Sequence, residues 1–167
     1  MKQLILISTF FLFVSCSSDT KTDTTETSST ESTNDFKSFV GDNALTFINA
    51  YVENCNKMKE SVGIVEWANS NEFASNHFKT ELEKIVTEAN EADPEMGLGF
   101  DPIFDAQDYP EEGFEIDSFN SEPNFIIVIG KNMPDFRLTM NMVDSNGIWM
   151  VDGCGIVNIP NDKRSKR

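Results

Sequence analysis

The stretch that decides the fold is FRLTMNMVDSNGIWMV, residues 136–151. In its first half apolar side chains alternate with polar ones, which is the period of a β-strand with one buried face. Asn146-Gly147 follows, and this dipeptide is typical of a two-residue hairpin turn because both central residues need a positive φ. The sequence therefore predicts two antiparallel strands, 136–142 and 148–151, joined by a tight turn.

Two further strands are predicted upstream of this hairpin. Residues 114–117 alternate apolar and acidic side chains, and residues 125–129 are continuously apolar. A continuous apolar run is typical of a central strand that is covered on both faces. With the hairpin, these segments form a four-stranded antiparallel meander.

The first half of the chain has a helical period instead. Apolar residues recur there at every third or fourth position, which places them on one face of a helix. The members of this stripe are Val40, Ala44, Phe47, Ile48, Tyr51, Val52, Cys55 and Met58. Asp42 is predicted as the N-cap, and residues 62–68 fit either helix or loop.

A later helix is predicted from Thr80, because residues 80–83 have the spacing of a capping box. Asp93-Pro94 is expected to end it, since the residue before a proline avoids helical geometry. Helices followed by strands predict one α+β domain over residues 36–162, with N-terminal helices packed on a curved four-stranded antiparallel sheet. The basic tail, residues 163–167, is expected to be a frayed terminus.

The composition is strongly acidic. The 167 residues include 13 Lys+Arg against 28 Asp+Glu, for a formal net charge of -15. Nucleic-acid binding depends on Lys and Arg at phosphates, and attraction to anionic lipid does too. The charge therefore argues against a nucleic-acid-binding domain and against electrostatic docking on a membrane.

The chain begins with a short positive start and an apolar run over residues 4–14. This run is too short to span a bilayer, and it has the length and flanks of a secretory signal peptide, residues 1–15. Val14-Ser15-Cys16 resembles a bacterial lipobox. The resemblance implies acylation of Cys16 (palmitate or a similar chain) and, with Ser17 following, anchoring at the outer membrane, on its periplasmic or surface side. The alternative is an ordinary signal peptide that contains a cysteine.

Residues 16–35 follow as a tether, rich in Ser and Thr and without aliphatic or aromatic side chains after the cysteine. Such a segment buries too little apolar area to offset its ordering entropy, so we expect a solvated linker.

Several segments of the folded domain resemble a known group of proteins. These are Trp67, residues 93–102, residues 106–110 and residues 149–153. They are similar to an uncharacterised group of extracytoplasmic lipoproteins that carry an NTF2-like, cystatin-like α+β cone. The resemblance implies helices that close against a bent sheet, and it implies no particular reaction, because cone folds host isomerases, dehydratases, adaptors and binding modules.

Two cysteines remain once Cys16 carries lipid. Cys55 and Cys154 would then sit in an oxidising compartment, where paired thiols form disulfides. We expect a Cys55–Cys154 bridge; the alternative is two buried, reduced thiols.

The loop region 91–122 is rich in carboxylates and has no Lys or Arg. Asp101, Asp105 and Asp108 offer oxygen ligands for calcium, but their spacing departs from the calcium-loop pattern. We expect a solvated acidic lid without a metal, attached to the core by its aromatic and aliphatic side chains. Those side chains are Phe100, Ile103, Phe104 and Tyr109.

Catalytic motifs are scarce. His77 is the single histidine, and no phosphate-binding loop, dinucleotide fingerprint or nucleophile elbow is present. Tyr51 with Asp152 is the one acid–base pair that such a cone suggests. We expect no enzyme and no cofactor.

Three functions follow as hypotheses. The first is a lipid-anchored, non-catalytic module that binds a small apolar ligand among five aromatic side chains: Tyr51, Trp67, Phe100, Tyr109 and Trp149. The second is an inhibitor or immunity-type protein whose acidic face binds a basic hydrolase or toxin. The third is a cone-pocket isomerase or dehydratase.

Overall fold

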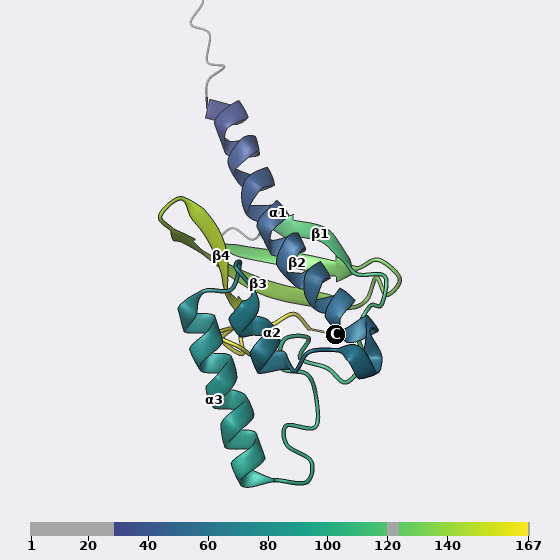
Figure 1. Ribbon diagram of the computed structural model, residues 1–167. Coiled ribbons are helices and arrows are strands. Elements are labelled where there is room, and N and C mark those ends of the chain that lie inside the picture. The colour runs from purple at the N-terminus through teal and green to yellow at the C-terminus, as the bar shows by residue number, and fades with distance from the viewer. Residues whose placement is uncertain (1–28, 120–123, 167) are drawn as a thin grey trace, which may run out of the picture.

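The structure is a computed structural model that describes residues 29–119 and 124–166 (Figure 1). The predicted signal peptide, Cys16 and the first part of the tether lie outside the described residues. Within the described part, no helix is both long and apolar enough to cross a membrane.

Helices come first and strands second. The helices are α1 (Ser29–Asn56), a 3-10 turn (Met58–Glu60), α2 (Ile64–Ser70) and α3 (Asn76–Ala92). The strands are β1 (Phe114–Phe119), β2 (Phe125–Gly130), β3 (Arg137–Ser145) and β4 (Ile148–Cys154). Neighbours pair antiparallel in the order β1-β2-β3-β4. The predicted α+β class and the four-stranded meander are confirmed.

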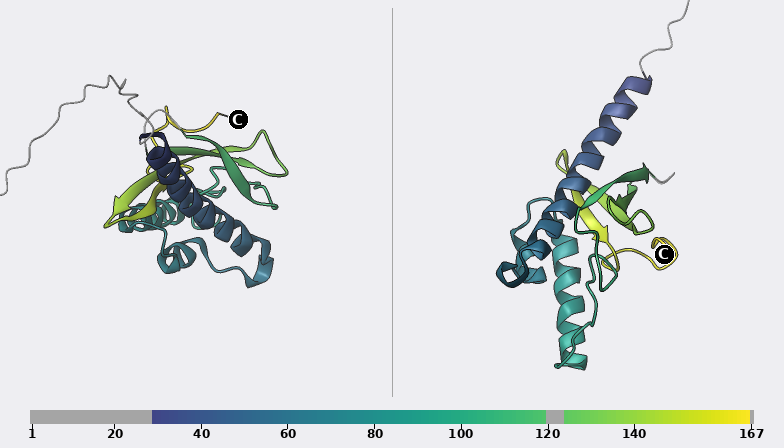
Figure 2. Two further views of the ribbon diagram at one scale, coloured as in Figure 1. Left: turned by 90° about the horizontal axis from the view of Figure 1, so that it is seen from above. Right: turned by 90° about the vertical axis from the view of Figure 1, so that its right-hand side faces the viewer.

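Helix α1 crosses one face of the sheet and contacts all four strands (Figures 1 and 2). The predicted stripe on α1 is buried at Val40, Ala44, Phe47, Ile48, Tyr51 and Val52. Opposite it lie the inward side chains of the sheet, which include Ile126, Val128, Leu138, Met140 and Met142. This core packs the helical first half of the chain against the sheet of the second half. That arrangement is expected from a helical hydrophobic period followed by a strand period.

The two ends of α1 differ from the prediction. Met58 is 75% exposed, because the helix ends at Asn56 and Met58 has a φ of 55° in the turn that follows. At the other end α1 begins at Ser29, so Asp42 is inside the helix and is not its N-cap. Residues 29–35 of the predicted tether are helical, since extending an anchored helix needs no new nucleus.

Helix α3 begins earlier than its capping-box spacing suggested. Ser75 is the N-cap, and its Oγ accepts a hydrogen bond from the backbone N of Phe78 at 2.9 Å. Thr80 and Glu83 lie inside the helix, one turn later. The predicted end is confirmed, because α3 stops at Ala92, just before Asp93-Pro94.

The hairpin turn is confirmed, with φ values of 57° at Asn146 and 84° at Gly147. The C-terminal segment is not frayed over residues 163–166, because it lies against the outer face of the sheet (Figure 2, right). Thr139 on β3 donates from Oγ1 to the carbonyl of Lys163 at 2.9 Å, and Arg164 donates from Nε to the carbonyl of Ile159 at 3.1 Å.

Candidate functional site

A half-buried carboxylate, Asp101, attaches the acidic loop between α3 and β1 to helix α1. Tyr51 on α1 donates its phenolic hydrogen to Oδ2 of Asp101. The other oxygen, Oδ1, accepts from the backbone N of Ile103 at 2.8 Å and of Phe104 at 3.0 Å. Both oxygens therefore have donors within the protein, and the side chain acts as a latch between loop and helix.

Burial raises the pKa of Asp101 above its usual value, and the hydrogen bonds from Tyr51, Phe104 and Ile103 oppose that rise. Burial and then the nearby Asp101 charge raise the pKa of the Tyr51 phenol as well. A perturbed carboxyl beside a phenol is typical of acid–base sites. Here, however, both partners are used to join chain segments.

The two cysteines lie near this latch and are both free thiols. Burial first, and the Asp101 charge second, raise the pKa of Cys55 to about 11 and that of Cys154 well above its usual range. Because the thiolate is the reactive form, neither thiol is activated.

The expected Cys55–Cys154 bridge is not formed in the structure. Cys154 directs its Sγ toward the carbonyl oxygen of Ile103, at 3.5 Å, and the Cys55 thiol lies beside the Tyr51 hydroxyl. The bridge stays a prediction for the protein in an oxidising compartment.

Three of the five aromatic side chains predicted to bind a ligand pack together in the core. Tyr51 contacts Trp67, with ring centroids 4.6 Å apart, and Tyr51 contacts Phe104 at 4.9 Å. Tyr109 stacks on the far side of Phe104 at 5.0 Å. Tyr51, Trp67 and Phe104 are buried and fill the space between one another, so they form packing, whereas the half-buried Tyr109 also lines a surface hollow.

The other two aromatic side chains lie elsewhere. Trp149 is half-buried on β4, and Phe100 is 37% exposed in the acidic loop. The predicted attachment of that loop through Ile103 and Phe104 is confirmed, since both are buried, and it is wrong for Phe100.

Asp152 does not pair with Tyr51; Tyr51 pairs with Asp101 instead. Asp152 accepts a hydrogen bond from Ser75 Oγ at 2.6 Å and lies 3.1 Å from Nδ1 of His77. Ser, His and Asp thus meet, but the serine hydroxyl is bonded to the carboxylate and caps α3, and the His77 ring is 67% exposed. In a serine hydrolase the histidine stands between the other two, so this cluster lacks the required order.

Within residues 29–119 and 124–166, no group of three or more His, Cys, Asp or Glu is placed to hold a metal ion. Asp101, Asp105 and Asp108 therefore do not converge, because Asp101 is used by the latch.

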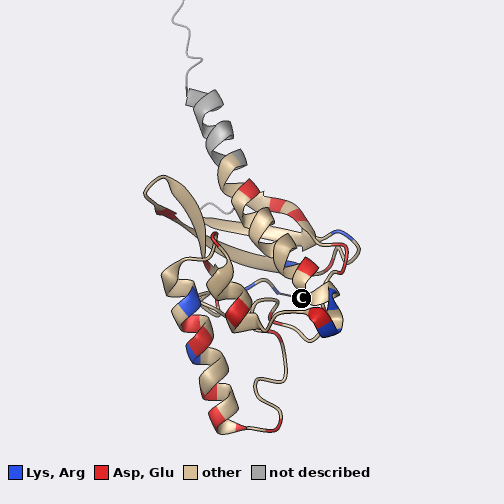
Figure 3. Ribbon diagram, viewed as in Figure 1, with Lys and Arg blue, Asp and Glu red and all other residues tan. Residues whose placement is uncertain are grey.

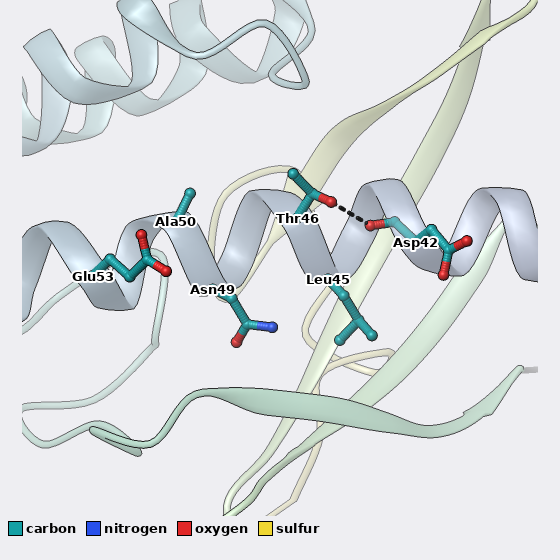
Figure 4. Close-up of a pocket in the computed structure, with 6 residues that line it drawn as sticks. All are labelled: Asp42, Leu45, Thr46, Asn49, Ala50 and Glu53. Carbon is teal, nitrogen blue, oxygen red and sulfur yellow. Dashed lines mark hydrogen bonds between the residues drawn. The ribbon is translucent and has the colours of Figure 1, made fainter.

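Surface hollows adjoin one another along one side of the molecule. The first, of about 500 Å³, lies along α1 (Figure 4) and is lined by Asp42, Leu45, Thr46, Asn49, Ala50 and Glu53. The second, of about 320 Å³, shares Asn49 and Glu53 and adds Val52, Asn56, Glu111, Glu112, Gly113 and Lys131. All are open to solvent rather than enclosed.

Two further hollows continue the series. One of about 320 Å³ shares Glu111 and is lined by Gln107, Asp108, Tyr109, Asn132 and Met133 besides. The next, of about 400 Å³, shares Met133 and adds Pro134, Asp135 and Phe136. We call the residues that line these four hollows the acidic groove.

The groove carries mostly negative charge. Its carboxylates are Asp42, Glu53, Asp108, Glu111, Glu112 and Asp135, and its cation is Lys131. Acidic positions also occupy the exposed face of α3 (Figure 3). The groove differs from α3 in being hollowed, and its walls come from α1, the loop before β1 and the β2–β3 turn.

Asn49 joins two walls of the groove. Its Nδ2 donates to the carbonyl of Phe114 at 3.2 Å, and its Oδ1 accepts from the backbone N of Phe114 at 2.7 Å. In Figure 4 the side chains of Leu45 and Asn49 point from α1 toward β1. Sequence reasoning missed this residue, because a polar side chain beside an apolar stripe gives no sign of its partner.

Comparisons with known proteins give no relative: the chain matches no protein-family model, no curated protein and no solved structure.

Proposed function

We propose that this protein is a non-catalytic binding module, held at the cell envelope by an acylated Cys16, that binds a basic segment of a partner protein along the acidic groove. The observation that carries the proposal is the set of adjoining hollows lined by carboxylates. The expected partner is a basic hydrolase or toxin, as in the second of the three hypotheses drawn from the sequence.

The interior favours this function over binding of a small apolar ligand. Phe47, Tyr51, Phe104 and Phe114 are almost completely buried and pack in contact with neighbouring rings. A ligand among them would have to displace side chains that already fill the core, and overfilling a packed core is destabilising. The open hollows need no such displacement.

The charge of the whole chain supports the choice of partner. A net charge of -15 attracts cationic proteins over a distance and speeds their association, with an effect that falls as salt rises. The groove then supplies local carboxylates for Lys or Arg side chains.

We also propose that the domain is an NTF2-like, cystatin-like cone and that Cys16 anchors it at the outer membrane. Support for the cone is the order of elements, helices followed by a meander, with α1 across one face of the sheet. Support for the anchor is the lipobox-like sequence at residues 13–16.

The test is a calorimetric titration of the full chain with a synthetic peptide in which Lys and Val alternate. We expect binding that weakens steeply with salt. Replacing Glu53→Gln and Glu111→Gln together should weaken it about tenfold, because two groove carboxylates lose their charge.

The matched control is Glu83→Gln with Glu88→Gln on the exposed face of α3, which removes the same charge elsewhere. It should change the affinity much less than the groove pair does. Equal loss in both pairs would show attraction to net charge alone, and absence of binding would reject the proposed function.

A further inference from the structure

The two edge strands of the sheet differ in whether another segment of the chain pairs with them. Strand β4 is an edge, and residues 73–75 pair with it: Val151 donates to the carbonyl of Phe73 at 2.7 Å and accepts from the backbone N of Ser75 at 2.9 Å. Strand β1 is the other edge. Among the described residues, no strand and no isolated bridge pairs with its outer side.

We infer that the outer edge of β1 is the position where the basic segment docks, and that the segment binds there as an added, extended strand. This inference rests on the proposed function and specifies how the partner is held. Strand addition supplies affinity through main-chain hydrogen bonds, and pockets beside the edge select the side chains.

The backbone of β1 presents the required groups. Phe114 turns its N–H and C=O away from β2, because both are bonded to the Asn49 side chain. Bonding direction alternates along an antiparallel strand, so Ile116, which pairs with Val128 two positions on, turns its N–H and C=O outward as well. Asn49 thus occupies the start of the edge. Among the described residues no strand pairs with Ile116 on its outer side, and a β-bulge between Ile116 and Ser118 ends the regular alternation there.

The acidic groove begins where this edge begins. The hollow of about 320 Å³ that includes Gly113, Glu111 and Glu112 adjoins the first residue of β1, and Asn49 belongs to it. A strand added along β1 would therefore extend from the edge into the groove. The two features adjoin at Asn49.

The charges on β1 select among the occupants of such an edge. Glu115 is exposed on its outer face, and Asp117 beside it lies with Oδ2 3.3 Å from Nη1 of Arg137. A second copy of this chain would place carboxylates against carboxylates, and like charges directly opposite are destabilising. A strand with Lys or Arg at alternate positions reverses that sign.

The inner face of β1, which faces α1, determines which side chains suit the other alternate positions of an added strand. Ile116 is half-buried and lies beside Gly41 of α1, and Leu45 of α1 points toward β1. Side chains of the added strand on this face would meet apolar groups. The partner segment is therefore one in which basic and apolar residues alternate.

The test compares three peptides with the full chain: the alternating Lys-Val peptide, the same peptide N-methylated at its Lys residues, and the same peptide N-methylated at its Val residues. All three have equal charge. A strand bonds its neighbour through alternate N–H groups, so one methylated series should bind about tenfold more weakly and the other should bind as the parent does. Equal binding by all three, or equal loss in both methylated peptides, overturns the inference.

Hydrogen exchange at the Ile116 amide gives a second readout. The parent peptide should slow its exchange by about tenfold or more at saturation, because a free edge N–H becomes bonded. Binding without any change at Ile116 overturns the proposed docking at the β1 edge but leaves the proposed binding along the acidic groove in place. If no peptide binds at all, the proposed function itself fails.

Discussion

Asp101 shows how one side chain can fix a loop. Its two oxygens accept from Tyr51, Ile103 and Phe104, and the bond from Tyr51 attaches this part of the loop to α1. The sequence marked Asp101 as a calcium candidate, because a carboxylate-rich loop gives the same pattern for a ligand and for a latch. Only the hydrogen bond from Tyr51 distinguishes a latch from a calcium ligand, and Tyr51 is fifty residues away in the sequence.

We predict opposite effects for two replacements of Asp101. The folded-state pKa of Asp101 is raised, so its contribution to stability is full below the unfolded pKa and is lost as pH rises through the folded value. Asp101→Asn keeps an acceptor for the two backbone N–H groups and removes this loss, so it should equal the wild type in acid and exceed it at neutral pH.

Asp101→Ala should destabilise at every pH by about 1–3 kcal/mol, because buried donors lose their acceptor. Urea unfolding across a pH series measures both variants. A wild type more stable than Asp101→Asn at neutral pH would show that the hydrogen bonds outweigh the cost of burying the charge.

The thiols give a second prediction at this scale. In the reduced protein, Cys55 should react slowly with iodoacetamide near neutral pH and faster as pH approaches its pKa of about 11. Cys154 is completely buried and should react only after unfolding. Mass spectrometry of a time course measures each site, and equal rates at the two cysteines in the folded protein would contradict this environment.

Helices and strands were predictable from the sequence wherever a hydrophobic period continued over a long stretch. The stripe from Val40 to Val52 identified the buried face of α1, and the Asn146-Gly147 turn identified the β3–β4 hairpin. Element ends were harder, because they depend on single caps. Thr80 has the right chemistry for a cap but lies inside α3, where Ser75 caps instead.

Ser75 therefore carries a prediction for α3. Ser75→Ala should cost about 1–2 kcal/mol of unfolding free energy, because the N-cap bond to Phe78 and the bond to Asp152 are both lost. Thr80→Ala, which removes an exposed hydroxyl bonded to the Asn76 carbonyl, is the matched control and should cost far less. Denaturant unfolding measures both, and equal costs would contradict the role of Ser75.

At the scale of the whole molecule, the composition predicted the sign of the surface charge but not the shape of the surface. A net charge of -15 already favours a cationic partner. The groove, however, is assembled from α1, the loop before β1 and the β2–β3 turn, which are distant in sequence. No local pattern reports how such segments meet, and none shows that Tyr51 and Trp67 are buried in the core while Phe100 is exposed.

The most direct test of the acidic groove is a map of where a basic strand binds. The alternating Lys-Val peptide is titrated into the ¹⁵N-labelled full chain at two salt concentrations. Amide shifts should concentrate at Asn49, Glu53, Glu111 and Gly113, with little change on α3, and should shrink as salt rises. Shifts centred on α3, or spread evenly over every acidic surface, would contradict the account.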